Sequence, residues 1–147
     1  MRYSRTLLAL ALGAAAVGGC KKKENGTVNA DSSVVVNQPS FRVKQVDLGK
    51  AIGSDKRVAN GTDHFAPRDT IYASVVSEGN GPSRTLMARW SFEDGQVVQE
   101  QTETIAPSGE AVTEFHILKP SGWPVGKYKL EILSDGAVVQ TKDFEVK

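Results

Sequence analysis

Potential metal ligands gather in one short stretch of the chain. Asp63 and His64 are adjacent, and Asp69 follows in the same polar segment. Because imidazole nitrogens and carboxylate oxygens are common ligands of zinc, these three residues could hold a metal ion, and a metal-dependent hydrolase is one hypothesis for the chain. Three ligands in one loop are a weak pattern, however, and a solvated polar loop explains them equally. We favour the loop, and we expect no metal ion and no cofactor.

The remaining residues offer little for catalysis. The second histidine, His116, stands two positions after Glu114 at a strand position expected to face solvent. The sequence contains no nucleophile elbow, no H-E-x-x-H pair, no phosphate-binding glycine loop and no C-x-x-C pair. We therefore predict that the chain is not an enzyme.

Cys20 is the only cysteine, so neither an intramolecular disulfide nor a cysteine-based zinc site can form. Two basic residues, Arg2 and Arg5, and an apolar run over residues 6–19 precede it. Fourteen residues (19−5) are too few to cross a bilayer comfortably. A basic start followed by a short apolar run that ends in small residues is typical of an export signal.

The four residues Val17-Gly18-Gly19-Cys20 resemble the lipobox of bacterial lipoproteins. The resemblance implies cleavage between Gly19 and Cys20, a diacylglycerol on the Cys20 sulfur and anchoring in the cell envelope by more than one acyl chain. It also implies the outer membrane, facing the periplasm, because Lys21 stands where lipoproteins retained in the inner membrane carry Asp. An ordinary signal peptide that happens to end before a cysteine is the alternative.

Composition divides the chain into three parts: a lipoprotein signal peptide over residues 1–19, the lipidated cysteine with a flexible polar tether over residues 20–40, and one domain over residues 41–147. Removing the signal leaves 18−2=16 basic and 17 acidic side chains, a net charge of −1. Because such a chain has no strong positive field, a nucleic-acid partner is not expected.

The domain has the alternating pattern of strands. One face of each strand is apolar, as at Ile71, Ala73 and Val75, at Leu86, Ala88 and Trp90, and at Tyr128, Leu130 and Ile132. In the strand after Phe92 we expect Val97 or Val98 to be buried. Asn60-Gly61 predicts a tight turn, and Asp94-Gly95 and Asp135-Gly136 predict type I′ hairpins. About seven short strands separated by turns indicate an all-β, antiparallel β-sandwich.

This pattern resembles immunoglobulin-like and fibronectin-type domains. Trp90 stands where such domains place a core tryptophan, and Tyr128 stands where they place the tyrosine corner, at the start of the penultimate strand. The paired cysteines of antibody domains are missing. The resemblance implies a single immunoglobulin-like β-sandwich.

A lipid-anchored sandwich with no catalytic motif indicates a binding or adaptor module with a protein partner in the envelope. The loops over residues 78–84 and 119–125 are the expected contacts, with residues 53–69 as a third, and the candidate contact residues are Asn80, Arg84, Trp123 and Pro124. Trp123 could stack on a sugar ring, which would make the domain a carbohydrate-binding module for cell-wall or surface glycan. It could equally plug the end of the sandwich, which we favour because tryptophan is highly buried on average. Tyr72, Val76 and Met87 could form an apolar outer face.

Overall fold

The structure is a computed structural model that describes residues 40–147. The predicted signal peptide, Gly19, Cys20 and nearly all of the tether lie outside the described residues. Within residues 40–147, no helix is long and apolar enough to cross a membrane. The described chain forms eight strands: β1 Arg42–Gly49, β2 His64–Phe65, β3 Ile71–Glu78, β4 Arg84–Phe92, β5 Gln96–Ile105, β6 Ala111–Ile117, β7 Gly126–Ser134 and β8 Ala137–Val146.

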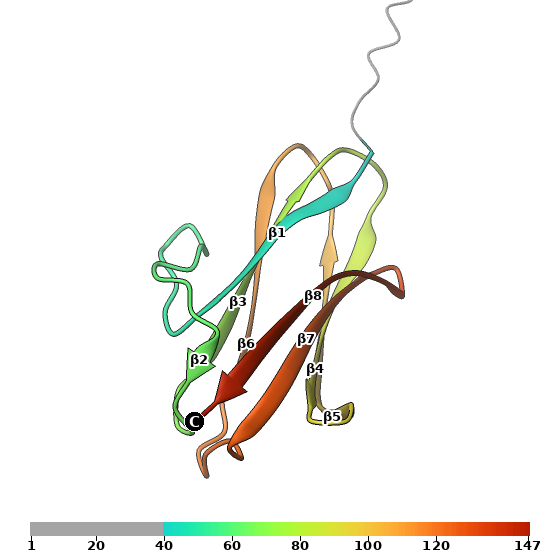
Figure 1. Cartoon of the computed structure of the whole chain (residues 1–147). Coiled ribbons are helices and arrows are strands. Elements are labelled where there is room, and N and C mark those ends of the chain that lie inside the picture. Colours follow the sequence, from blue (N-terminus) through green and yellow to red (C-terminus); the bar gives the residue numbers. More distant parts are fainter. Residues whose placement is uncertain (1–39) are drawn as a thin grey trace, which may run out of the picture. The chain divides into compact units, whose positions relative to one another are not determined.

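The strands form two sheets. One has the order β1-β3-β6 and the other the order β2-β8-β7-β4-β5 (Figure 1). Neighbouring strands are antiparallel except for the two-residue β2, which runs parallel to β8. The prediction of an all-β, immunoglobulin-like sandwich is therefore confirmed. The eighth strand is β2, whose two residues are too few to give an alternating pattern.

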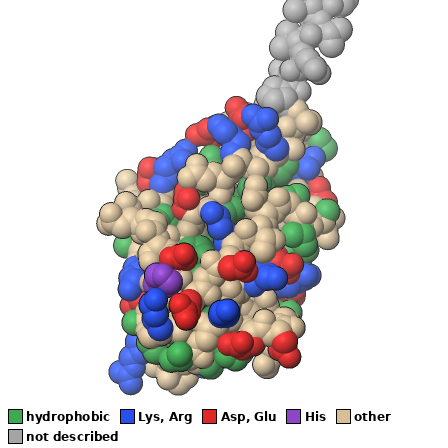
Figure 2. Space-filling view, viewed as in Figure 1, with side chains coloured by type: hydrophobic (Ala, Val, Ile, Leu, Met, Phe, Trp, Pro, Cys, Tyr) green, Lys and Arg blue, Asp and Glu red, His purple; other side chains and the backbone are tan. Residues whose placement is uncertain are grey.

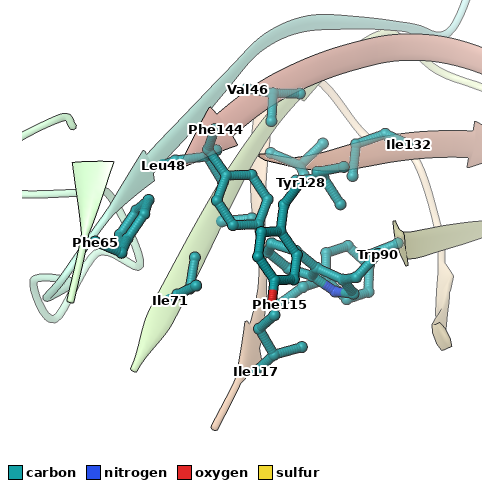
Figure 3. Packing of buried hydrophobic residues seen from close by; sticks show 14 of the residues in the cluster. Val46, Leu48, Phe65, Ile71, Trp90, Phe115, Ile117, Tyr128, Ile132 and Phe144 are labelled. Carbon is teal, nitrogen blue, oxygen red and sulfur yellow. The ribbon is translucent and has the colours of Figure 1, made fainter. Parts of the chain in front are cut away.

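Apolar residues from both sheets meet in one core. Ile71, Ala73 and Val75 of β3 face Leu130 and other residues of the second sheet, and all four are fully buried. Aromatic rings fill the middle of this core, and Figure 3 shows Phe144 beside Tyr128 with Trp90 and Phe65 nearby. The predicted core position of Trp90 is confirmed, because its side chain has no exposed surface.

The expected apolar outer face does not form one patch. Tyr72 and Val76 lie on β3 of the smaller sheet, whereas Met87 lies on β4 of the larger one. Val76 is also buried, with 3% of its surface exposed. Its neighbours across the sheet are Gln45 of β1 and Val112 of β6, so β3 is a central strand with side chains on both flanks.

The prediction for β5 is wrong, because Val97 and Val98 are 50% and 37% exposed. The strand is an outer member of its sheet and pairs only with β4. The larger sheet has five strands and the smaller has three. Val97 is paired with Ser91 on the outer face of β4, and Val98 is the extra residue at the register shift between Trp90 and Ser91, so the inward alternation is interrupted at these two valines.

Of the two hairpin turns predicted from the sequence, one is present and one is not. Asp135 and Gly136 have φ angles of 48° and 85°, which confirms the type I′ hairpin between β7 and β8. In the hairpin between β4 and β5, positive φ angles occur at Glu93 and Gly95 instead of Asp94 and Gly95, so the predicted type I′ turn is wrong. The reason is a three-residue connection in which the Glu93 N–H donates to the Lys127 carbonyl oxygen at 2.8 Å.

The tight turn expected at Asn60-Gly61 lies elsewhere. The N–H of Gly53 donates to the Arg57 carbonyl oxygen at 2.8 Å, and Lys56 between them has a φ of 62°. Gly61 instead bridges to Gly49 at the end of β1. Close packing explains this glycine pair in part, since a Cβ on Gly49 would lie 2.4 Å from the Val58 side chain.

Candidate functional site

Tyr128 fixes the loop over residues 119–125 to the core. Its hydroxyl donates to the Pro124 carbonyl oxygen at 2.8 Å, which confirms the predicted tyrosine corner. Its ring stacks on Phe144 with centroids 5.2 Å apart. Burial raises the pKa of the Tyr128 hydroxyl, and the negative charge of Glu93 raises it further.

Trp123 packs against this corner. Its side chain is 7% exposed and meets the Tyr128 ring edge to face at 6.4 Å. The Lys119 ammonium lies 5.7 Å from the centre of the indole ring. This burial leaves no open ring face for a sugar, so the geometry favours the plug over the stacking platform.

Two of the three predicted contact loops lie side by side. The Trp123 N–H donates to the Pro67 carbonyl oxygen at 2.7 Å, which joins residues 119–125 to the end of the 53–69 segment. Pro124 and its neighbour Val125 are exposed at this place, and Val125 has 67% of its surface exposed. The loop therefore presents apolar surface although its tryptophan is buried.

A depression of about 510 Å³ lies between this loop and the β4–β5 hairpin. Apolar side chains and one cation line most of it: Phe92, Val97, Val98, Lys119, Trp123 and Pro124. On the β5 side, the depression is bordered by the two exposed valines described above. It therefore adjoins the outer edge of β5. We call this continuous region, made of the outer edge of Gln96–Ile105 and the depression, the β5 surface.

Asn80 and Arg84 do not join Trp123 and Pro124. The turn after β3 lies near the Ser77–Ala111 pair, whereas residues 119–125 follow the Ile71–Ile117 pair at the other end of the same strands. The Arg84 guanidinium lies 4.5 Å from the centre of the Phe41 ring and 3.5 Å from the Asp135 carboxylate. Asn80 is exposed and bridges to Ser40 and Ser108.

The predicted metal ligands are only partly brought together. His64 lies between two carboxylates, with Nε2 3.5 Å from Asp63 and Nδ1 3.6 Å from Glu145. The Asp69 carboxylate instead accepts the Ala66 N–H at 2.7 Å and pairs with Lys50 at 2.8 Å. Among residues 40–147 no three ligand side chains are placed to hold a metal ion.

The Asp69 contacts lower the pKa of its carboxyl group. The Lys50 hydrogen bond is the larger cause and the Ala66 N–H the next.

His64 and Glu145 border a groove of about 490 Å³ on the outer face of β7 and β8. Figure 2 shows this face, on which acidic and basic side chains are intermixed. The groove itself is lined by both carboxylates and lysines.

The sequence pattern does not predict the β5 surface, because Val97 or Val98 is expected from it to be buried. A signal was nevertheless present in the charges. Between Arg89 and Lys119 the sequence contains six acidic residues and no Lys or Arg. Two of the six, Glu100 and Glu103, lie on β5.

No protein-family model and no curated protein matches the sequence. Among solved structures, a β-glucosidase from Erythrobacter marinus is similar over 74% of this chain with a TM-score of 0.51 and 11% identity. An immunoglobulin-like protein from Pseudomonas aeruginosa is similar over 75% of this chain and 98% of its own, with a TM-score of 0.49 and 13% identity. The chain spans 15% of the glucosidase. At these identities the likeness concerns the fold alone.

Proposed function

We propose that this chain is a lipid-anchored, non-catalytic binding module of the bacterial cell envelope, and that it binds a protein partner through the β5 surface. One observation carries the proposal: Val97 and Val98 are exposed on β5, an outer strand of the larger sheet, and line the depression beside it. Exposed apolar residues that adjoin a concave site are a common feature of protein interfaces.

The anchor is proposed from the sequence. Residues Val17 to Cys20 have the size pattern of a lipobox, and Lys21 follows. Cleavage before Cys20 and acylation of its sulfur would hold the domain at the outer membrane, on the periplasmic side. A module in this place meets envelope proteins at a membrane surface, which suits an adaptor.

A protein partner fits the β5 surface better than a glycan does. Sugar recognition uses an open aromatic face, and the candidate platform, Trp123, is 7% exposed. The exposed wall of the depression is instead made of aliphatic valines. We therefore rank the carbohydrate-binding module second.

Position-specific photocrosslinking in the intact envelope tests the proposal. A photoreactive amino acid is placed at Val97 in the whole chain, and the matched control places it at Val138, which is 49% exposed on β8. We expect one discrete protein adduct from position 97 that disappears when Val98→Lys is added, and no adduct from position 138. Equal adducts from both positions, or none from position 97, would contradict the proposal.

A further inference from the structure

We infer that β5 accepts an extended, lysine- or arginine-bearing segment of the partner protein as an additional antiparallel strand. This inference rests on the proposed function, because it names the kind of partner that the β5 surface binds. It is carried by the free edge of β5, its charge and the depression at one end of it.

The backbone of β5 offers the pairing groups. The strand has ten residues, Gln96–Ile105, and is hydrogen-bonded to β4 on one side only. On the other side, alternate residues present N–H and C=O groups that a strand of another chain can satisfy. At the opposite edge of the same sheet, β2 has only two residues and pairs with β8 at Glu145 and Val146.

The charge of β5 selects a basic segment. Glu100 lies on the outer face, where it accepts a hydrogen bond from Arg89 at 2.8 Å. Glu103 pairs in register with the buried Leu86, so it lies on the inner face, and within residues 40–147 no cation forms an ion pair with it. Lysine or arginine on an added strand would meet Glu103 from a neighbouring position.

The inner side of β5 carries polar side chains at three successive inward positions. Gln99, Gln101 and Glu103 face inward opposite Trp90, Ala88 and Leu86. The Gln101 amide oxygen is buried and has no hydrogen-bond donor among the described residues. An added strand can bring donors to this side, since its alternate side chains point the same way as these three.

The depression lies at the other end of β5 and is lined in part by apolar side chains. Val97 and Val98 line it together with Phe92 and Trp123. A strand that pairs along β5 therefore reaches the depression where β5 begins. An aliphatic side chain of that strand would bind in the depression. Backbone pairing along β5 would then supply affinity, and the depression would supply specificity.

Charge also argues against a second copy of this chain as the occupant. Two β5 strands paired about a two-fold axis would bring Glu100 and Glu103 of both copies into one interface. Those four carboxylates repel one another, and like charges facing each other across a strand pair are destabilising. A positively charged segment would instead be attracted to these carboxylates.

Synthetic eight-residue peptides test the inference with the whole purified chain. The probe alternates Lys with Val, and the matched control alternates Glu with Val. Two further probes carry N-methyl groups either on all Lys or on all Val residues, so each one blocks pairing along one edge. Binding is measured by fluorescence anisotropy, and the contact is located by amide shifts of Gln96–Ile105.

We expect the Lys/Val peptide to shift the β5 amides, the Glu/Val peptide to leave them unchanged, and one of the two methylated peptides to lose binding. Glu100→Gln combined with Glu103→Gln should weaken binding about fivefold, as expected for exposed ion pairs. Asp143→Asn combined with Glu145→Gln removes the same charge from β8 and should leave binding unchanged.

Equal binding of the Lys and Glu peptides, or binding of both methylated peptides, would overturn strand addition. A concentration-dependent dimer with protected β5 amides would identify a second copy as the occupant. Peptide binding that appears only after Lys21, Lys22 and Lys23 are changed to Gln would identify the chain's own tether. An adduct from position 97 without peptide binding would retain the proposed function and remove this inference alone.

Discussion

The hydroxyl of Tyr128 donates to the Pro124 carbonyl oxygen at 2.8 Å, and this bond joins the start of β7 to the loop that carries Trp123. The same ring stacks on Phe144 and meets Trp123 at its edge. One side chain therefore connects the core to the wall of the proposed binding depression.

Tyr128→Phe removes this hydrogen bond and keeps the ring. We expect a loss of about 1 kcal/mol in the free energy of unfolding, the usual value for one intramolecular hydrogen bond. Urea denaturation of the whole chain measures it, with Tyr72→Phe as the control, because Tyr72 lies on the outer face of β3. An unchanged midpoint for Tyr128→Phe would mean that the corner does not stabilise the loop.

The pH dependence of stability follows from the raised pKa of Tyr128. In the folded chain the hydroxyl keeps its proton to a higher pH than in the unfolded chain. The unfolded state therefore loses a proton first, and stability declines as pH rises above about 10, the pKa of an unperturbed tyrosine. We expect the alkaline decline of the urea midpoint to be shallower in Tyr128→Phe, and an unchanged slope would contradict this assignment.

Gly79 is held where a side chain cannot fit. Its φ is 129°, and a Cβ added there would lie 2.6 Å from the Cα of Phe41. Gly79→Ala should therefore destabilise the domain by about 3 kcal/mol, through the clash and the unfavourable φ together. Gly81→Ala is the control for the clash, because its φ of 155° is also unfavourable for a side chain but nothing lies within 4 Å of the added Cβ. Equal thermal unfolding midpoints for the two variants would show that β1 can move aside.

The sequence predicts best where a strand is covered on one side by the other sheet. In β3, β4 and β7 the inward residues alternate with outward ones, because both neighbours and the opposite sheet are present. Asp135-Gly136 is predictable for a local reason, since both residues must tolerate positive φ. Trp90 and Tyr128 could be assigned from their positions in this strand order.

The features that the sequence did not predict depend on contacts between distant residues. Val97 and Val98 look like core residues, but a register shift between β4 and β5 interrupts the inward alternation there. His64 meets Glu145 only because β2 pairs with β8, which is 81 residues later (145−64). The register that places Glu103 on the inner face likewise comes from the pairing of β4 with β5.

Trp123→Ala separates a packing role from a binding platform. Because the side chain is 7% exposed, we expect a loss of about 3 kcal/mol in unfolding free energy, as for other large core aromatics. Val125→Ala in the same loop, where the side chain is 67% exposed, should change stability by less than about 0.5 kcal/mol. Thermal unfolding measures both. A stable Trp123→Ala variant that has lost glycan binding would return the carbohydrate-binding module to first place.

Cys20→Ser tests the proposed anchor. Serine has nearly the size of cysteine but no thiol to carry a diacylglycerol, so the folded domain should move from the membrane fraction to the soluble periplasmic fraction. The change lies outside residues 40–147, so the domain itself is unchanged. The control is Lys21→Gln, which keeps the thiol and should stay with the membrane through its acyl chains. Fractionation combined with mass measurement of the mature N-terminus reports both outcomes. A Cys20→Ser chain that is exported, folded and still membrane-bound would show that something other than a lipid on Cys20 holds it there.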